Sequence, residues 1–192
     1  MQHDIHLDGF GIRLEPVTAD HASDLWALTD DELWAGMTTP RPTDPADYAR
    51  HIVTQQETPG MLAFAVIDDT DGRILGSTSL YDLSIPQRRV EIGSTWYGRA
   101  SWGGRTNPAA KYLLFRHAFE TLGLARVALR CDARNTRSAA AIRRLGAVPE
   151  GILRAHRVAA DGSRGDTAYF SVVEEEWPAV AAGLLARLAA AG

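Results

Sequence analysis

Residues 89–146 decide the fold of this chain, and they read RVEIGSTWYGRASWGGRTNPAAKYLLFRHAFETLGLARVALRCDARNTRSAAAIRRLG. The stretch begins with a β-type run and continues into a loop that holds a tryptophan, two glycines and an arginine. A helical pattern follows, then a second β-type run over residues 125–132, and then a shorter helix that Gly146 ends. The order strand, loop, helix, strand, helix predicts that a ligand binds in this part of the chain.

The remaining elements lie on both sides of this stretch. In chain order we expect a strand over 10–16, helices over 18–30 and 44–56, strands over 61–67 and 73–81 joined as a hairpin, a second hairpin with strands over 150–159 and 166–173, and a final helix over 174–190. This order fits an α+β fold of three layers, with a mixed, mostly antiparallel twisted sheet and helices on both faces. It does not fit a doubly wound parallel sheet. The length of 192 residues suits one core, so we expect a single domain over 1–192.

Composition excludes several classes of protein. A net charge of −4 argues against a general nucleic-acid binder, which is normally basic. The single cysteine, Cys131, excludes an internal disulfide framework and indicates a reducing compartment. The first residues do not read as a signal peptide, and the apolar run over 179–192 is shorter than a membrane span and contains Arg187. We therefore expect a cytoplasmic protein with no membrane partner.

The glycine loop has the composition of an anion site. Thr106 or Asn107 can cap the helix that follows, with Pro108 in its first turn. Backbone N–H groups at a helix start point at one spot and favour negative charge. Gly103 and Gly104 allow a ligand close to the backbone, Trp102 can shelter one side, and Arg105 can grip two phosphate oxygens. A plain helix cap after a surface glycine turn is the alternative.

Two kinds of nucleotide site and a metal site can be excluded from motifs. A P-loop reads G-x-x-x-x-G-K-[ST], whereas the match from Gly98 to Gly103 continues with Gly104 in place of lysine. A dinucleotide fold needs an early strand, G-x-G-x-x-G and a parallel sheet, which the chain does not offer in that order. The six histidines show no metal-ligand spacing, so we expect no metal site.

The run from Val90 to Gly151, with the element order of nearly the whole chain, resembles the GCN5-related N-acetyltransferases (GNAT). Its RimJ/RimL-like ribosomal-protein N-acetyltransferase branch is the most similar. Three motifs in this order carry the resemblance: WGGRTNPAAK (102–111), NTRSAAAIRRLGA (135–147), and EGILRAH (150–156) with YFSVVEEEW (169–177). The diphosphate loop of the family reads Arg/Gln-x-x-Gly-x-Gly/Ala. Arg99 and Gly104 keep its ends, while Trp102 stands where the first glycine would be.

The resemblance implies an acyl-CoA-dependent N-acyltransferase. It implies acetyl-CoA as co-substrate, with no metal, and direct attack by a primary amine in a ternary complex. Backbone amides of the strand around Ser94 to Tyr97 would donate hydrogen bonds to the thioester oxygen and to the pantetheine arm. The implied coenzyme-binding residues are Trp96, Tyr97, Trp102, Gly103, Gly104, Arg105, Thr106, Asn107 and Asn135. A homodimer is compatible with the sequence.

Two residues are candidates for catalysis. Glu91 occupies the strand on which the family often places its catalytic glutamate, and Gly93 on the same side would leave room for substrate or water. The alternative is a structural carboxylate that pairs with an arginine (Arg88, Arg89 or Arg130). Ser138 is the acid candidate for the departing thiolate, with stabilisation of the helix's first turn as its alternative. Ile142 stands about where many relatives carry a tyrosine acid.

Asn135 resembles the asparagine that binds the pantetheine arm, and it can cap the helix as well. Lys111 could reach a phosphate from its helix, although exposure to solvent is the default for a lysine. His117 is expected to be a packed or surface residue. His156 lies where it could face the acceptor.

The identity of the acceptor stays open. Trp34 and Met37, with several acids in TDDELWAGMTTPRPTDP (29–45), could line a groove for a cationic amine. A protein N-terminus, an internal lysine, a polyamine and an amine antibiotic are all compatible, as are acyl groups larger than acetyl. A non-catalytic acyl-CoA-binding module is the alternative from a different class.

Overall fold

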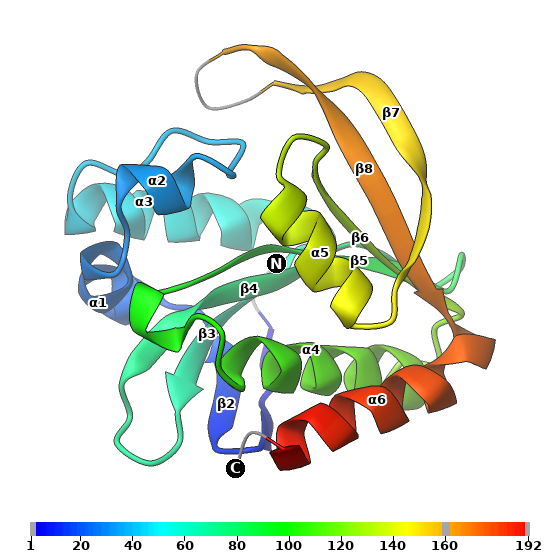
Figure 1. Cartoon of the computed structure of the whole chain (residues 1–192). Helices are drawn as coiled ribbons and strands as arrows, with labels where there is room; N and C mark the ends of the chain where they lie inside the picture. The colour runs from blue at the N-terminus through cyan, green and yellow to red at the C-terminus, as the bar shows by residue number, and fades with distance from the viewer. Residues whose placement is uncertain (1–2, 159–161, 191–192) are drawn as a thin grey trace.

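The computed structural model of the protein describes residues 3–158 and 162–190, and these contain one eight-stranded sheet (Figure 1). The spatial order of the strands is β1-β2-β3-β4-β5-β6-β8-β7. The strands are β1 (Leu7–Gly9), β2 (Ile12–Pro16), β3 (Leu62–Asp68), β4 (Ile74–Ser84), β5 (Arg89–Tyr97), β6 (Arg126–Asp132), β7 (Val148–Val158) and β8 (Arg164–Val173). Only β5 and β6 pair in parallel, and every other neighbouring pair is antiparallel. The predicted mixed, mostly antiparallel sheet is confirmed.

Helices cover both faces of the sheet. They are α1 (Ala22–Ala27), α2 (Asp31–Trp34), α3 (Pro45–Glu57), α4 (Thr106–Arg116), α5 (Thr136–Arg144) and α6 (Trp177–Ala190). One core cluster joins α4, α5 and α6 to one face through Phe64, Leu113 and Phe170. A second cluster joins α1, α2 and α3 to the other face through Ala65 and Trp34. The three predicted layers are therefore present. No helix of the described residues is long and apolar enough to cross a membrane.

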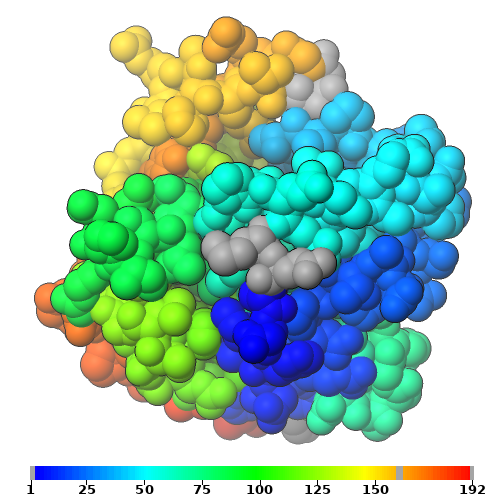
Figure 2. All heavy atoms as spheres, turned by 180° about the vertical axis from the view of Figure 1, so that it is seen from behind, coloured from blue at the N-terminus to red at the C-terminus, as the bar shows by residue number. Residues whose placement is uncertain are grey.

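The views from the two sides show how these parts lie. In Figure 1, α4 and α6 lie beside each other along one side of the sheet, and the hairpin β7–β8 extends away from them. From behind, α3 (cyan) crosses the middle of the molecule between the N-terminal strands (blue) and the hairpin (yellow and orange; Figure 2). The hairpin therefore rises above α3 and α2, over the face opposite α4 and α6.

Most predicted elements are present, with three differences. The sequence did not predict the short β1 or the single turn of α2, because neither is long enough to show a period. The N-cap prediction for α4 is wrong: the N-cap is Arg105, with helical φ and ψ of −75° and −18°, and no side chain caps the helix. Because the backbone is helical already at Arg105, neither Thr106 nor Asn107 can adopt the extended geometry of a capping residue.

An irregularity in β5 separates this strand from β6. Its parallel pairing with β6 runs from Arg89↔Arg126 to Ile92↔Leu129 and goes no further in the described chain. Directly after it, Ser94 has φ of +46°, and the register with β4 shifts between Ser77 and Ser79. A bulge of this kind bends a strand and re-aims its side chains. The C-terminal halves of β5 and β6 therefore separate.

Candidate active site

A cavity of about 590 Å³ fills the opening between β5 and β6. Residues 92–97 of β5 and 129–132 of β6 form two walls, and the loop before α4 and the first turns of α4 and α5 form the others. Beyond Ile92 the edge of β5 that faces β6 has no neighbouring strand within the described residues, so backbone groups there are available to a ligand. The predicted residues that line the cavity are Trp96, Tyr97, Trp102, Gly103, Gly104, Asn107, Asn135 and Ser138.

The cavity is basic although the protein is acidic. Its lining includes five basic residues, namely Lys111, Arg130, Arg137, Arg144 and Arg187. Among the residues that the structure describes, Asp132 is the only acid in the lining, and it already pairs with Arg134 at 2.8 Å. In a chain with net charge −4, such a concentration of cations indicates that the cavity binds an anion.

Trp102 is held in place by its neighbours in the glycine loop. Its indole Nε1 donates to the Tyr97 carbonyl oxygen at 2.7 Å. The Arg137 guanidinium lies 4.2 Å and that of Arg99 5.0 Å from the centre of its rings. Gly103 has φ of +73°, and a Cβ built on it would meet nothing within 4 Å. Trp102 thus stands at the motif position where the first glycine was expected, and its side chain leaves the space beside Gly103 open.

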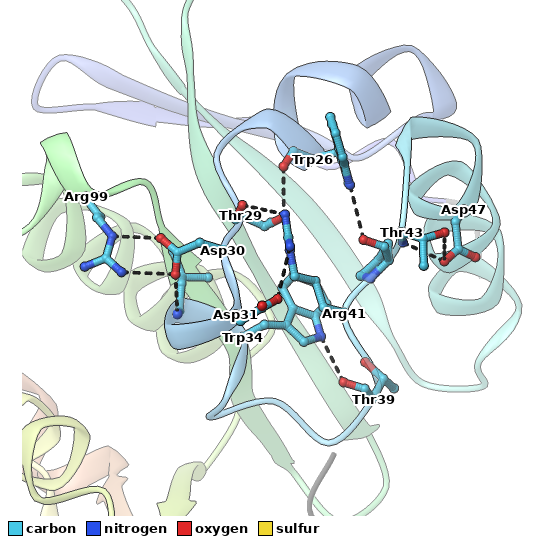
Figure 3. Close-up of polar contacts among 12 residues, drawn as sticks. Trp26, Thr29, Asp30, Asp31, Trp34, Thr39, Arg41, Thr43, Asp47 and Arg99 are labelled. Carbon is cyan, nitrogen blue, oxygen red and sulfur yellow. Dashed lines mark hydrogen bonds and ion pairs between the residues drawn. The ribbon is translucent and has the colours of Figure 1, made fainter. Parts of the chain in front are cut away.

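Three residues of the predicted loop have other contacts. Arg99 donates to Asp30 at 2.8 and 3.0 Å (Figure 3). It also donates to Glu32 at 2.7 Å, so two carboxylates at the start of α2 neutralise its charge. The Arg105 guanidinium lies against Gly11 in the β1–β2 turn. Arg105 and the buried Thr106 are not among the residues that line the cavity. The direct role expected of these side chains has no support in this geometry.

Lys111 differs from both expectations: it is neither exposed at the surface nor placed as a simple phosphate ligand. It is the only lysine of the chain, and only 5% of it is exposed. Its Nζ donates to Thr95 Oγ1 at 2.7 Å, next to the bulge of β5. Burial lowers the pKa of Lys111 to about 7. No carboxylate of the described residues forms an ion pair with it. The expectation of a solvent-exposed lysine is therefore wrong, because this helix face packs against β5.

Asn135 and Ser138 meet at the start of α5. The Asn135 Oδ1 accepts from the Ser138 backbone N–H at 2.9 Å, so Asn135 is the N-cap as expected. Burial raises the pKa of the nearby Cys131 thiol. Ser138, Cys131 and Asn135 all line the cavity. The capping oxygen is occupied, which leaves the Asn135 amide nitrogen for a ligand.

Strand alternation brings four polar side chains together on the other face of the sheet. Val90, Ile92 and Val127 point into the core with α4, so Glu91 and Arg130 point away from it. Tyr81 on β4 lies directly opposite Glu91 in register, and Tyr169 on β8 lies opposite Arg130. The network of these four residues follows from this register.

Glu91 is held between a tyrosine and an arginine. The Tyr81 hydroxyl donates to Glu91 Oε1 at 2.5 Å, and Arg130 Nε lies 2.8 Å from the same oxygen. Arg130 also donates to the Tyr169 hydroxyl at 3.0 Å. Burial raises the pKa of Glu91, against the opposing effects of the Tyr81 hydrogen bond and the Arg130 charge. Glu91 therefore has both features that the sequence left as alternatives: it pairs with an arginine, as a structural carboxylate would, and its pKa is raised, as suits a base.

One expectation about Glu91 is wrong. Gly93 does not leave free room beside it, because a Cβ at Gly93 would lie 2.5 Å from the Tyr81 hydroxyl. The Tyr81 ring fills that space, and only 7% of the Glu91 side chain is exposed. Tyr81 and Arg130 thus separate the carboxylate from open space. Sequence reasoning missed Tyr81, and only the register between β4 and β5 could have revealed it.

The sequence also matches a known protein family over most of its length. Residues 12–148 match the family described as "Acetyltransferase (GNAT) domain". The chain belongs to this family. The matched region contains the opening between β5 and β6, the glycine loop and the Tyr81–Glu91 pair, and the resemblance seen in the sequence is confirmed.

Individual GNAT relatives agree with this assignment. The chain is 35% identical over 107 residues to "Putative ribosomal N-acetyltransferase YdaF" of Bacillus subtilis (strain 168), a match that spans 56% of this chain and 57% of that protein. A solved structure of a "putative acetyltransferase" from T. thermophilus is 34% identical with a TM-score of 0.89, and the match covers 98% of this chain and 99% of that one. A GCN5-related N-acetyltransferase from Brucella melitensis is 30% identical with a TM-score of 0.90 over 97% of this chain and 86% of that one.

Proposed function

We propose that this GNAT protein, as one catalytic domain, transfers an acyl group, acetyl in the first place, from acyl-CoA to a primary amine. The observation that carries the proposal is the basic cavity in the opening between β5 and β6, which adjoins the Tyr81–Glu91 pair. Coenzyme A carries a diphosphate and a thioester on an extended arm. A cavity with free strand amides and several cations suits such a molecule.

The loop and the two helices would hold the coenzyme. Backbone N–H groups at Gly103, Gly104 and the start of α4 suit the diphosphate. Lys111 lies on the same face of α4 as Asn107, one turn earlier, and side chains of a helix lean toward its N-terminus. Its amine, which donates to Thr95 at the wall of the cavity, would be favoured in its protonated form by a bound anion. The free amide nitrogen of Asn135 and the strand groups of β5 suit the pantetheine arm.

Acyl-CoA supplies the activated acyl group, and the residues of the chain manage the protons. The acceptor must lose one proton as its nitrogen bonds to the carbonyl carbon, and the thiolate sulfur must gain one as its bond to that carbon breaks. Tyr81 would pass its hydroxyl proton to Glu91 while its oxygen takes a proton from the acceptor. A carboxyl with a raised pKa is the better proton acceptor for such a relay. Ser138 would hydrogen-bond the departing sulfur, and the thiolate would take its proton from solvent water.

The test is release of coenzyme A thiol from acetyl-CoA and succinyl-CoA in the presence of a panel of small amines and peptides. Amine-dependent release that Glu91→Gln suppresses is expected. Stabilisation of the protein by acetyl-CoA without turnover on any amine would instead indicate a binding module. Absence of any thermal shift with acetyl-CoA would refute the coenzyme assignment.

A further inference from the structure

A second cavity of about 420 Å³ adjoins the first on the acceptor side of the sheet. Residues of the loop after α2, the end of β4 and the strands β5, β6, β7 and β8 line it. The two cavities share Gly36, Met37, Gly93, Ser94, Arg130 and Cys131. An acceptor in the second cavity would therefore approach the Tyr81 hydroxyl and the bulge of β5 together. We call this second cavity the acceptor groove.

The formal charges that line the acceptor groove are those of two arginines. Arg130, His156 and Arg157 line it, and no aspartate or glutamate does so among the residues that the structure describes. The carboxylates nearby are already paired: Glu91 contacts Arg130 at 2.8 Å. Asp132 contacts Arg134 at 2.8 Å and Arg157 only at 3.8 Å. Arg157 thus shares its carboxylate partner with Arg134 and forms the longer of the two ion pairs.

Arg157 is built as a buried receptor. Only 10% of its side chain is exposed. Its Nη2 donates to the Met37 and Gly36 carbonyl oxygens at 3.1 and 3.4 Å, which fixes the guanidinium against the loop after α2. Its Nε is buried and has no hydrogen-bond partner within residues 3–158 and 162–190. An unpaired buried donor of a charged group is costly, so a bound acceptor oxygen would relieve that cost.

The acids that were expected to attract a cationic amine lie elsewhere. Asp30 and Glu32 bind Arg99, and Asp31 binds Arg41 at 3.1 Å. Asp44 is the N-cap of α3, and its Oδ1 accepts from the Asp47 backbone N–H at 2.8 Å. Each of these carboxylates is used to fold the segment between α1 and α3. The expectation of an acidic groove is therefore wrong, because local arginines and backbone donors neutralise the acids.

We propose that the acceptor carries a carboxylate close to its amino group, and that Arg157 binds this carboxylate in the acceptor groove. The proposal rests on the acyl-transfer function above and adds the class of acceptor. Two sources share this chemistry: a free amino acid, through its own carboxylate, and a peptide whose N-terminal residue is followed by an acidic side chain. Polyamines and other purely cationic amines are poor acceptors, because Arg130 and Arg157 repel them.

The experiment compares acceptors that differ only in the carboxylate. Glycine is paired with glycinamide, and the peptide Ala-Asp-Ala amide is paired with Ala-Asn-Ala amide. For each pair kcat/KM is measured by thiol release, and binding to the protein saturated with coenzyme A is measured by calorimetry. We expect the acid to exceed its amide by about 10- to 100-fold in at least one pair, the range for a hydrogen bond to a charged group. The pair that responds identifies the source of the carboxylate.

Variants of Arg157 localise the effect. Arg157→Gln should abolish the preference for the acid while the amide acceptor and the KM for acetyl-CoA change little. Arg157→Lys should restore part of the preference, because it keeps the charge. Arg154→Gln is the matched control, since Arg154 is an exposed arginine on the same strand that does not line the groove.

The outcomes separate the two proposals. Equal kcat/KM and equal binding for acid and amide in the unmodified protein would overturn the carboxylate assignment, and this comparison needs no variant to fold. An equal loss for acid and amide in Arg157→Gln would overturn it as well, because it would show that Arg157 only holds the hairpin to the loop after α2. Selective binding of the acids without turnover would leave the carboxylate site standing and refute acyl transfer.

Discussion

Replacing Lys111 with methionine should stabilise the ligand-free protein and weaken its binding of coenzyme A. The two side chains have similar length, but methionine brings no charge into the core. In the native protein, burial lowers the pKa of Lys111 from 10.5 to about 7, whereas the unfolded chain keeps the ordinary value. Folding at neutral pH therefore has to remove a proton from this amine or bury its charge.

The size of this cost follows from the two pKa values. One pKa unit corresponds to about 1.4 kcal/mol, so a lysine that titrates near 7 when folded and 10.5 when unfolded destabilises the protein by about 4 kcal/mol at pH 7. Methionine avoids that cost but loses the hydrogen bond to Thr95, which is worth about 1 kcal/mol. Thr95 stays bonded to Thr78 Oγ1 at 2.7 Å. A net gain of about 3 kcal/mol is expected at pH 7.

The pH dependence has a definite sign. Between pH 7 and 10.5 the unfolded state binds more protons than the native state, so the stability of the unmodified protein rises with pH in this window. The advantage of Lys111→Met is therefore full below pH 7 and fades as the pH approaches 10.5. Urea unfolding of both proteins at pH 7 and pH 10 measures this difference, and effects of other groups cancel between them.

Coenzyme A binding gives the second half of the test. Protonated Lys111 should contact the anionic ligand, so the dissociation constant should rise about tenfold or more in Lys111→Met, as for loss of a hydrogen bond to a charged group. In the unmodified protein, binding should weaken from pH 7 to pH 9, and in the variant it should not. A destabilised variant at pH 7, or a stability gain equal at both pH values, would refute the reasoning about burial.

Three further changes test other parts of the site. Glu91→Gln should lower kcat/KM at neutral pH. In the unmodified enzyme, activity should be lost on acidification from a pH above the ordinary carboxyl pKa, because burial raises the pKa of Glu91, and the variant should not show this loss. An unchanged pH profile would exclude Glu91 as the proton acceptor. Gly93→Ala should lower kcat while coenzyme affinity stays the same, because the added Cβ would lie 2.5 Å from the Tyr81 hydroxyl and displace it. Steady-state kinetics and calorimetry measure the two quantities. A parallel loss of kcat and coenzyme affinity would show instead that the change unfolds the strand. Asn135→Ala should lower stability by about 1 kcal/mol through loss of the helix cap. Asn135→Asp keeps the cap and should weaken only coenzyme binding. Thermal melts measure the effect on stability, and calorimetry measures the effect on binding.

The parts of the fold that could be predicted are those with a local cause. The short helix after Asn135 begins and ends where its cap and Gly146 place it, and the strands on each side of the bulge follow alternation. The glycine loop stood out in the sequence because two glycines before a helix that contains an early proline form a local pattern. Its side chains could not be placed. Arg105 turns to Gly11 and Arg99 to Asp30, contacts that join residues far apart in the sequence.

Recognition of the Tyr81–Glu91 pair required knowledge of the register between β4 and β5. Glu91 stood out by its place on a strand, but its partner Tyr81 is ten residues away, and the bulges between β4 and β5 set which residues face each other. Burial of Lys111 has a similar origin, since the pattern of α4 is apolar on several sides and does not show which residue meets β5. These features depend on how elements pack, and single-sequence patterns do not encode that directly.

The position of the only lysine has a practical consequence. Lys111 is the only lysine of the chain and is buried, so the folded protein presents no lysine side chain on its outer surface to amine reagents, which do not ordinarily modify arginine. A reagent can modify Lys111 only when the cavity admits it, and the lowered pKa of this amine gives it a larger neutral, reactive fraction than an exposed lysine has. The rate of labelling at this one position would therefore report how often the cavity opens, and a bound coenzyme should slow it.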